Sequence, residues 1–550
     1  MLNVLAAHSL VDLLDRDVAR VPAAIAVRDR TDAGMIEWPY REYAAQVYRL
    51  ARLLKERGVT SGQTVGILLP NCRWWGVAFL AVQALDAVAV PIDIRLGVDE
   101  TAAIVKAAGI TVLVAAAHFK EKTGALVPAG VRLAQLVELD THAAQGALGG
   151  EPTPLPRLGM RCNPAVIIYT SGTTGTPKGV VLTNANLLTN VADLLDLLEI
   201  SAQEHFVSVL PLNHVYEITG GFLAPLALGA SVTYASSLRP DIIFKTIRDA
   251  EMTVMMVVPA FLRLFMERIK VEAAKQAGAR FTMALRLSKA LLRCGIPAGR
   301  ILFRQLRAHV SPRFKCFISG GAPVDPELVF EYAALGLTVL QGYGLTETSP
   351  VIAVNTLRHN RLGSVGRPVA SAELRIEPVE GRAQGEGELW VRGALVFKDY
   401  FRAPELTAAA FHMDWFRTGD LVRMDRAGYL HICGRIKNLI VTEGGKKVVP
   451  EDIEHVLLHC PFVLDACVLG MPGKEQGEEP VAVIVPAREK AAALCGTDHA
   501  AQDALVRREL QAALAGIADY KRPRRFVFLD ELPRTATLKV KRHELRRMLE

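Results

Sequence analysis

Short apolar runs alternate with segments of helical length through the first 160 residues. The runs TVGILLP at 64–70, AVAVPID at 87–93 and ITVLVAA at 110–116 have the length and the mostly apolar character of strands that are buried on both faces. Helix-length stretches separate them, and this alternation is typical of a parallel sheet that is covered by helices on both sides. The pattern predicts a doubly wound α/β architecture.

The same alternation continues in the next 160 residues and then changes character. From about residue 364 to 434 the expected strands shorten and Gly and Pro turns become frequent, which predicts a small antiparallel sheet or β-barrel. Residues 435–550 read as a compact α+β unit, with a helix that begins at Pro450. The apolar runs of the second α/β round lie at 165–170, 205–211, 231–235, 252–259 and 314–320.

Composition limits the class of protein. The chain has 550 residues, 51% of them hydrophobic and 22% charged, so we expect a large core and more than one folding unit. Lys and Arg (64) exceed Asp and Glu (57) by only seven, which does not predict a nucleic-acid partner. The eight cysteines include no CxxC pair, which argues against a zinc ribbon or a thioredoxin-like motif and fits reduced thiols in the cytoplasm.

The apolar segments also bear on location. The first twenty residues lack the basic start, long apolar run and cleavage site of a signal peptide, and they predict an amphipathic helix instead. The longest apolar stretches, 77–91 and 220–234, are shorter than the roughly 20 residues that a membrane-spanning helix needs. We therefore expect a cytoplasmic protein.

One local charge cluster stands out between residues 263 and 315. Thirteen Lys and Arg oppose two acidic residues, Glu267 and Glu272, in a helical pattern, and this net charge of +11 exceeds the +7 of the whole chain. Such a basic amphipathic patch is typical of peripheral contact with the anionic inner face of a membrane. A solvated helical hairpin whose charges only keep it soluble explains the same pattern, so the sequence leaves both interpretations open.

The most informative motif is YTSGTTGTPKGVVLT at 169–183. It follows an apolar strand and precedes a helical pattern that begins near Asn184, which predicts a loop between strand and helix. Glycines such as Gly172 let the backbone approach an anion closely, and Lys178 adds a positive charge. The hydroxyls that can donate to phosphate oxygens belong to Thr170, Ser171, Thr173, Thr174 and Thr176.

A P-loop, GxxxxGK[ST], is the obvious competitor for this motif. Counting from Gly172 places Pro177 where the second Gly of the P-loop belongs and Gly179 where its Ser or Thr belongs. Two mismatches exclude the P-loop. We therefore expect a polyphosphate-binding loop of another kind.

Further motifs follow along the chain. SGGAP at 319–323 is a tight Gly-Gly turn after an apolar strand, and QGYGLTETSP at 341–350 combines an aromatic, a hydroxyl and a carboxylate. The others are WFRTGDLVRMDRAGYLHICGRIKNLI at 415–440, EGGKKVVPEDIE at 443–454 and LPRTATLKVKRHEL at 532–545. With the hydroxyl-rich loop, these motifs give a chain that resembles the adenylate-forming superfamily of acyl-CoA synthetases, acid ligases, luciferases and peptide-synthetase adenylation domains.

The resemblance implies a fold and a set of adenine contacts. A large N-terminal domain, 1–436, would hold two doubly wound α/β subdomains and a small β-barrel, and a small mobile α+β domain, 437–550, would follow. In this family the SGGAP turn lies along the adenine and the aromatic residue of the next motif stacks on it. The implied adenine contacts are Gly320, Gly321, Ala322 and Tyr343.

The phosphates, the metal and the ribose have implied contacts as well. By resemblance, Thr346 hydrogen-bonds the α-phosphate of ATP and Glu347 ligates Mg²⁺, which prefers hard oxygen ligands. Asp420 and Arg435 stand where family members hold the ribose hydroxyls, and a carboxylate can accept hydrogen bonds from two vicinal hydroxyls.

Residues around and after the domain boundary carry the remaining implied roles. Lys437 matches the charged hinge residue about which the small domain turns, and Gly444 and Gly445 match the glycine turn that faces the CoA thiol tunnel, although a plain hairpin explains that turn too. Lys539 matches the lysine that reaches the reacting carboxylate and the α-phosphate, with Lys541 as the runner-up. The Gly usual before the Tyr of VFKDYF is Asp399 here.

The resemblance implies an ATP-dependent ligase that converts a carboxylic acid to acyl-AMP and then passes the acyl group to CoA. His214, in LPLNHVYEITGG, stands where such enzymes often carry a gate between acyl pocket and CoA tunnel, although a histidine satisfied within the core is also possible. Gly220 and Gly221 would leave space for an alkyl tail. The chain looks most like bacterial long-chain fatty acid–CoA ligases.

Three other functions remain open at this point. A fatty acyl-AMP ligase would load an acyl carrier protein in place of CoA, and an aromatic-acid or medium-chain CoA ligase would differ only in the acyl pocket. A non-catalytic, membrane-associated nucleotide binder is disfavoured because every residue type with an implied chemical role is present. The alternatives differ in acceptor, in acid or in catalysis, so each is open to experiment.

Overall fold

The computed structural model describes residues 4–31, 34–126, 135–139, 152–155, 161–171, 177–473, 477–534 and 540–550. Its contacts divide the chain into two compact units. Unit 1 comprises Met1–Glu373 and Arg392–Asp414, and unit 2 comprises Leu374–Val391 and Trp415–Glu550. Each unit has its own buried apolar clusters.

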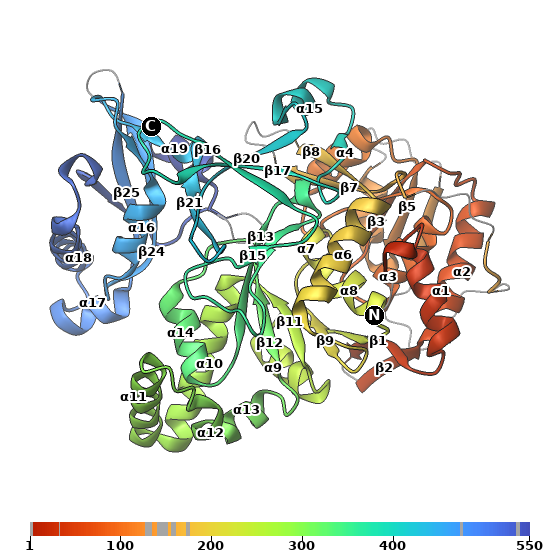
Figure 1. Cartoon of the computed structure of the whole chain (residues 1–550), viewed down its shortest axis with the longest axis horizontal. Helices are drawn as coiled ribbons and strands as arrows, with labels where there is room; N and C mark the ends of the chain where they lie inside the picture. The colour runs from red at the N-terminus through yellow and green to blue at the C-terminus, as the bar shows by residue number, and fades with distance from the viewer. Residues whose placement is uncertain are drawn as a thin grey trace. The chain divides into compact units, whose positions relative to one another are not determined.

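The first sheet of unit 1 is parallel at its centre and antiparallel at both edges (Figure 1). Its strands are β1 (Ile25–Thr31), β2 (Gly34–Pro39), β9 (His205–Ser208), β10 (Ser231–Tyr234), β11 (Val254–Val257), β12 (Cys316–Ser319), β13 (Val339–Gly344), β14 (Val351–Val354) and β15 (Arg367–Pro368). Their order is β15-β14-β13-β12-β11-β9-β10-β1-β2. β1 runs parallel to β10, with Val27 opposite Val232.

The second sheet of unit 1 is also mainly parallel. Its strands are β3 (Thr64–Leu68), β4 (Val88–Pro91), β5 (Val112–Ala116), β6 (Gln135–Leu139), β7 (Pro164–Ser171), β8 (Pro177–Thr183) and β18 (Asp399–Tyr400). Their order is β18-β8-β7-β4-β3-β5-β6, and β8 is antiparallel to both β7 and β18. The sheet therefore brings residues near 170, 178 and 400 together.

Helices connect these strands, as the alternating pattern predicts. They are α1 (Val11–Arg20), α2 (Tyr40–Glu56), α3 (Arg73–Gln83), α4 (Val98–Ala108), α5 (Lys120–Leu126), α6 (Asn184–Leu198), α7 (Val215–Glu217), α8 (Ala224–Leu228), α9 (Pro240–Asp249), α10 (Pro259–Ala277), α11 (Ala279–Arg293), α12 (Gly299–Leu302), α13 (Arg304–Val310), α14 (Pro326–Ala334) and α15 (Pro404–Ala410). Two starts follow from local sequence. Thr183 caps α6 through its hydroxyl, which accepts from the Asn186 N–H, and Asp325 caps α14 ahead of Pro326.

The doubly wound α/β fold that the sequence predicts is confirmed. The apolar runs of both rounds form β3, β4, β5, β7 and β9–β12, and the amphipathic N-terminal segment forms α1. The two sheets are not formed from two consecutive halves of the sequence, however. The N-terminal strands β1 and β2 belong to the sheet that β9–β12 form. Pairing between β1 and β10, about two hundred residues apart, has no local sequence signal.

The expected strand–loop–helix around residues 169–183 needs a correction. The segment Pro177–Thr183 forms β8, which pairs antiparallel with β7, and α6 begins only afterwards. The loop therefore joins the two strands of a hairpin, and the helix N-terminus does not follow it directly. The β-branched and apolar residues VVLT favour the strand.

Unit 2 contains the antiparallel sheet that the shortened strands predict, and a separate α/β layer. The antiparallel strands are β16 (Glu373–Pro378), β17 (Glu386–Arg392), β20 (Trp415–Met424) and β21 (Leu430–Arg435). The two-residue β19 (Phe411–His412) belongs to unit 1. The other elements are β22 (Ile440–Val441), β23 (Lys447–Val448), α16 (Pro450–Leu458), β24 (Val463–Pro472), β25 (Glu478–Pro486), α17 (Arg488–Cys495), α18 (His499–Ala513), β26 (Arg525–Phe528) and α19 (Arg542–Leu549).

Burial fits this architecture. The strands β4, β5 and β11 carry almost exclusively apolar side chains, because helices and neighbouring strands cover both of their faces. In unit 2 a separate cluster packs α16 and α18 against β24 and β25. Among the described residues, no helix is long and apolar enough to cross a membrane.

Candidate active site

Three side chains of unit 1 form a compact charged cluster where β8, β18 and the QGYGLTETSP motif meet. Lys178 Nζ donates to Glu347 Oε1 at 2.7 Å and to the Tyr400 hydroxyl at 2.8 Å. The Tyr400 hydroxyl in turn donates to Glu347 Oε1 at 2.8 Å. All three contacts in the triangle are charge-assisted hydrogen bonds: Lys178 is a charged donor in two of them, and Glu347 is a charged acceptor in two.

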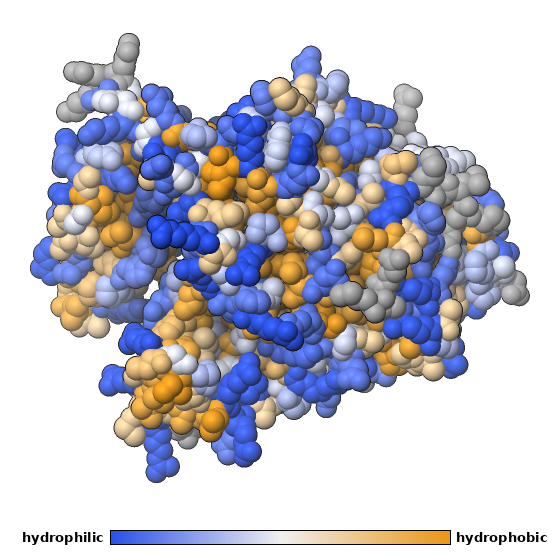
Figure 2. Space-filling view, in the orientation of Figure 1, coloured by the Kyte–Doolittle hydropathy of each residue, from blue (hydrophilic) through white to orange (hydrophobic). Residues whose placement is uncertain are grey.

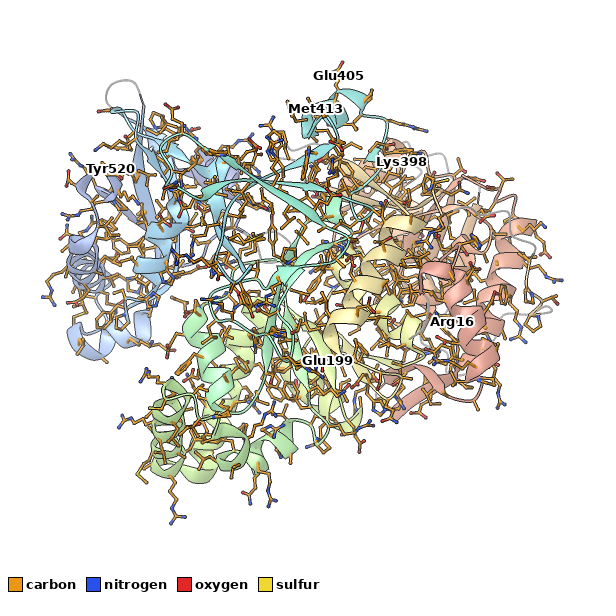
Figure 3. All side chains as sticks on the ribbon, in the orientation of Figure 1. Arg16, Glu199, Lys398, Glu405, Met413 and Tyr520 are labelled. Atoms are coloured by element: carbon orange, nitrogen blue, oxygen red, sulfur yellow. The ribbon has the colours of Figure 1, made fainter. Side chains whose placement is uncertain are left out.

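Strand pairing fixes this triangle. Lys178 is the second residue of β8, and Tyr400 is the last of β18, which pairs with β8. Lys398, labelled in Figure 3, donates its backbone N–H to the Val181 carbonyl oxygen at 3.0 Å and so ties the segment before Tyr400 to β8. Glu347 lies in a short 3-10 helix, η4 (Thr346–Thr348), and its carbonyl oxygen accepts the Phe397 N–H at 2.8 Å.

The electrostatics keep Glu347 ionised. Burial alone raises the pKa of this carboxyl, but the Lys178 ammonium and the Tyr400 hydroxyl outweigh burial, so the pKa of Glu347 lies below its ordinary value. Burial and the adjacent Glu347 charge raise the pKa of Tyr400, which therefore stays a hydrogen-bond donor at neutral pH. A cation, a carboxylate and a neutral hydroxyl thus stand together.

A buried, ionised carboxylate beside a lysine suits magnesium bound together with phosphate. Among the described residues no group of three or more His, Cys, Asp or Glu could hold a metal by itself. Magnesium does not need such a cage, because it is commonly held by one or two carboxylates, substrate phosphates and water. Glu347 therefore fits the expected magnesium ligand, and substrate oxygens would complete the coordination.

The end of β7 carries an unsatisfied hydroxyl. Thr170 lies opposite Lys178 in the β7–β8 register, and its buried Oγ1 has no hydrogen-bond partner among the described residues. A buried polar atom without a partner costs free energy, which a bound phosphate oxygen would offset. Gly172, Thr173, Thr174 and Thr176 lie outside the described residues, and of Ser171 the structure describes only the backbone.

The SGGAP turn follows β12 as predicted. Gly320 is buried, and a Cβ there would meet the Tyr216 ring at 3.0 Å, which explains why the turn needs glycine at this point. Gly321 has a φ of +81° and is exposed together with Ala322. The Tyr216 hydroxyl donates to the Ile318 carbonyl oxygen at 2.7 Å, so this ring links the turn to the LPLNHVYEITGG segment.

The next strand places two further expected residues. Tyr343 lies on β13 and is half-buried, and Thr346 begins η4, one residue before Glu347. At the same end of the sheet, β12 and β13 pair Ser319 with Gln341. Ser319 Oγ and Gln341 Nε2 are buried without a hydrogen-bond partner among the described residues, which marks this strand end as another place for a polar ligand.

His214 and Glu217 lie at the start of a helical segment. His214 is the N-cap of α7, and its backbone carbonyl accepts the Glu217 N–H at 3.1 Å. Glu217 is fully buried, and neither of its carboxyl oxygens has a hydrogen-bond partner of good geometry among the described residues. Burial raises the pKa of Glu217 to about 8, with a small opposing contribution from the Ser208 hydroxyl, so this carboxyl is largely protonated at neutral pH.

The segment after Glu217 is a π-helical turn, η3 (Ile218–Leu223), and it departs from one expectation. A Cβ on Gly221 would lie 2.4 Å from the Glu217 carboxyl, and one on Gly220 would lie 2.9 Å from the Met256 sulfur. These side chains therefore occupy the space beside both glycines, where the sequence predicts room for an alkyl tail. Only the Met256 thioether, which is flexible, is easily moved aside.

In unit 2, the two residues expected at the ribose are neighbours. Asp420 on β20 and Arg435 on β21 face each other in register, and Arg435 Nε lies 2.7 Å from Asp420 Oδ1. Lys437 lies two residues further, exposed, in the 3-10 turn η5 (Ile436–Asn438). Gly444 and Gly445 are exposed in the hairpin turn between β22 and β23, where Gly445 has a φ of +69°. Lys539 lies outside the described residues.

Two residues described above were not predicted from the sequence. Tyr400 stands next to Asp399, which was singled out, and Glu217 stands in LPLNHVYEITGG, but neither had an expected role. An aromatic in VFKDYF carries no local signal, since its partner Lys178 is 222 residues away. For Glu217, the sequence signal is a single Glu among the mostly apolar residues of HVYEITGG.

Comparison with known proteins identifies the family. The family model described as AMP-binding enzyme matches residues 14–401, and the model described as AMP-binding enzyme C-terminal domain matches residues 452–539. The chain belongs to this family of adenylate-forming enzymes. It is an AMP-forming CoA ligase that activates an acid by adenylation, and ATP, Mg²⁺ and CoA are the cofactors and co-substrates of the reaction.

Individual relatives cover nearly the whole chain. A feruloyl-CoA synthase from Amycolatopsis sp is 31% identical over 531 residues, which are 96% of each chain. The long-chain-fatty-acid–CoA ligase FadD13 of Mycobacterium tuberculosis is 28% identical over 535 residues, 94% of each chain. Among solved structures, ATP-bound MatB from Rhodopseudomonas palustris superposes with a TM-score of 0.81 at 26% identity, covering 98% of this chain and 99% of MatB.

Proposed function

We propose that this enzyme activates a medium- or long-chain fatty acid and transfers it to CoA. One observation carries the ligase chemistry: the hydrogen-bonded triangle of Lys178, Glu347 and Tyr400 beside the unpartnered Thr170 hydroxyl. The choice of a fatty acid is supported by the resemblance to bacterial long-chain ligases and by the relative FadD13. The basic segment 263–315 adds support, because peripheral membrane contact there suits an acid that dissolves in bilayers.

The first half-reaction joins the acid to AMP. The carboxylate oxygen attacks the α-phosphorus, and the bond from this phosphorus to the pyrophosphate oxygen breaks. Lys178 and the loop hydroxyls hold the pyrophosphate, and Thr346 and Lys539 offset charge at the α-phosphate. A magnesium ion held by Glu347 and phosphate oxygens would supply further neutralisation when bound.

The nucleoside has its own proposed contacts. Tyr343 and the turn of Gly320, Gly321 and Ala322 hold the adenine, and Asp420 and Arg435 hold the ribose. The buried position of Asp420 keeps its carboxylate oriented by Arg435, so that it accepts from vicinal hydroxyls. These contacts orient the α-phosphorus for attack from the side opposite pyrophosphate.

The second half-reaction forms the thioester. The CoA thiolate attacks the acyl carbon, and the bond from this carbon to the AMP oxygen breaks. We assign the hinge to Lys437, with domains 1–436 and 437–550, and the exchange of Lys539 for Gly444 and Gly445 at the acyl group follows this hinge motion. His214 acts as the gate between the acyl group and the approaching thiol.

A second candidate substrate is an aromatic acid. The feruloyl-CoA synthase is 31% identical over nearly the full length, which favours this class as much as FadD13 favours fatty acids. The Met256 side chain occupies the space beside Gly220. Either a flat ring or an alkyl chain would fit there only after the Met256 side chain moves. A carrier-protein thiol in place of CoA is the further alternative for the acceptor.

A substrate panel separates these possibilities. The purified enzyme is incubated with Mg-ATP, CoA and fatty acids of graded length, with ferulate and other aromatic acids in parallel, and acyl-CoA and AMP are followed by mass spectrometry. The proposal predicts that kcat/KM rises with chain length and exceeds that for every aromatic acid by about tenfold or more. A preference for aromatic or short acids contradicts it, and acyl-AMP that accumulates without acyl-CoA indicates a carrier-protein acceptor.

A further inference from the structure

The helices α10–α13 of unit 1 expose an unusual number of large apolar side chains. Figure 2 shows apolar side chains gathered over α11 and α12, with hydrophilic ones beside them, and Figure 1 places α10–α13 together at one end of the unit. The exposed fractions run from 43% at Leu302 to 81% at Ile301. The exposed apolar residues of these helices and their connections are Leu264, Val271, Met283, Leu287, Ile296, Ile301 and Leu302.

The spacing of these residues makes the helices amphipathic toward the outside. On α11, Met283 and Leu287 are four residues apart and share one face. On α10, Leu264 and Val271 are seven residues apart, two turns along one face, and Arg268 stands between them on that face. The inner face of α10 is buried in the core through Leu262, Phe265, Met266 and Ile269. The outer apolar residues are therefore not needed for the fold of the unit.

Basic side chains surround the apolar ones and are only partly neutralised. Some lysines pair within the unit, as Lys270 and Lys289 do with Glu331 at 2.6 and 3.0 Å. Other basic residues form no ion pair with any described residue and are exposed to solvent. These are Arg263, Arg280, Arg286, Arg300 and Arg304.

A basic pocket lies among the same helices. It has a volume of about 210 Å³ and is formed by α9, α10 and α13. Its lining contains three permanently basic side chains and a histidine against a single carboxylate, and Arg268 belongs both to this lining and to the apolar face of α10. The lining residues are Asp241, Phe244, Lys245, Arg248, Arg268 and His309.

We propose that α10–α13 form a docking surface for an anionic lipid bilayer, with the apolar side chains entering the interface and the arginines and the basic pocket contacting lipid phosphates. Apolar side chains framed by unpaired arginines are complementary to this partner, because lipid acyl chains accept the former and anionic headgroups the latter. An acidic protein would satisfy the charge but would leave most of the scattered apolar side chains in water. The proposal names a partner for the proposed fatty-acid ligase, and its binding test does not depend on which acid the enzyme uses.

Vesicle sedimentation with the full-length protein tests this surface. Without substrates, we expect binding to phosphatidylcholine vesicles that contain phosphatidylglycerol, much weaker binding to phosphatidylcholine alone, and a loss of binding as salt rises. The double variant Met283→Ser/Leu287→Ser and the double variant Arg280→Glu/Arg286→Glu should each weaken binding about tenfold or more. Ligase activity on a water-soluble short-chain acid, which needs no membrane, reports whether each variant is folded.

A matched control uses apolar residues of the same unit that lie elsewhere. Leu406 is 54% exposed and Met413, labelled in Figure 3, is 89% exposed, so Leu406→Ser/Met413→Ser should bind vesicles like the unaltered chain. Equal binding to both vesicle types, equal loss in the control, or no vesicle binding at all would overturn the proposal. Dimerisation without vesicles that the Met283 and Leu287 changes abolish would overturn it too, by showing a second copy as the occupant. Vesicle binding without turnover of any fatty acid would support the surface and refute the proposed substrate class.

Discussion

Lys178 and Glu347 form a 2.7 Å ion pair that joins β8 to the QGYGLTETSP motif. Tyr400 bridges the two by accepting from one and donating to the other. The pair holds a cation and an ionised carboxylate side by side, each satisfied by the other. Under the proposed function, bound phosphate and magnesium would replace these internal contacts.

Removing the charge of Glu347 tests its role in adenylation. Glu347→Gln keeps the shape of the side chain but eliminates the carboxylate that pairs with Lys178 and fits Mg²⁺. We expect the rate of acid-dependent ATP–pyrophosphate exchange to fall about 100-fold or more, because preorganised charge at a phosphoryl-transfer site contributes that much. An exchange rate within twofold of the unaltered enzyme, at saturating magnesium, would show that Glu347 has no part in the reaction.

We predict that the Tyr400 hydroxyl contributes to the reaction, a role that the sequence motifs alone do not indicate. Tyr400→Phe removes two hydrogen bonds to charged groups, and we expect about a 10- to 100-fold loss in kcat/KM for ATP with the fold intact. Tyr520→Phe in unit 2 is the control, since its ring lies against Lys446 and the change leaves the ring in place. Similar kinetics for both variants would remove Tyr400 from the site.

Replacing Lys539 should affect the two half-reactions differently. Lys539→Ala should reduce acyl-AMP formation about 100-fold or more while thioester formation from supplied acyl-AMP stays close to normal. Lys541→Ala is the matched change, because Lys541 pairs with Glu544 at 3.2 Å and is the alternative assignment. If Lys541→Ala loses adenylation and Lys539→Ala does not, the assignment moves to Lys541; equal losses in both half-reactions contradict the exchange of active-site groups.

Glu217 should make stability depend on pH. Burial raises its pKa from the ordinary 4.5 to about 8 in the folded chain, so between these values the folded chain holds a proton that the unfolded chain has released. The free energy of unfolding therefore falls as pH rises through this window, in total by about 5 kcal/mol, and levels off above it. Glu217→Gln, which mimics the protonated form, should lack this loss.

Denaturant titrations of both proteins at several pH values between 5 and 9 give the comparison. The difference in unfolding free energy between variant and unaltered protein should grow in favour of Gln as pH rises, roughly in line with linkage for one group. Parallel curves across the range would mean that Glu217 is ionised or paired in the folded chain.

Much of the architecture can be predicted from the sequence because local patterns of apolar and polar residues determine its helices and strands. Uninterrupted apolar runs predict β3, β4 and β5, and the basic helical pattern predicts α10–α13. The pairing of β1 with β10 and the strand β8 were not predicted. Both depend on which distant strand has unpaired backbone N–H and C=O groups available. A segment of four to seven residues does not contain this information.

The site divides in the same way. Lys178, Glu347, Tyr343 and Asp420 stand in motifs whose residue types already indicate nucleotide chemistry. Tyr400 enters only through strand pairing, and the unpartnered state of Glu217 depends on what packs around it. The spacing of residues shows which side chains are available, whereas the fold decides which of them lack a partner.

The most direct test of the account follows oxygen atoms through the reaction. A long-chain fatty acid with both carboxyl oxygens replaced by ¹⁸O is incubated with the enzyme, Mg-ATP and CoA. Mass spectrometry then gives the amounts and the ¹⁸O content of the products. Attack of the carboxylate on the α-phosphorus followed by attack of the thiol on the acyl carbon predicts equal amounts of acyl-CoA and AMP, with one ¹⁸O in each AMP. AMP without ¹⁸O, the label in pyrophosphate, or ADP and phosphate as the nucleotide products would contradict activation through acyl-AMP.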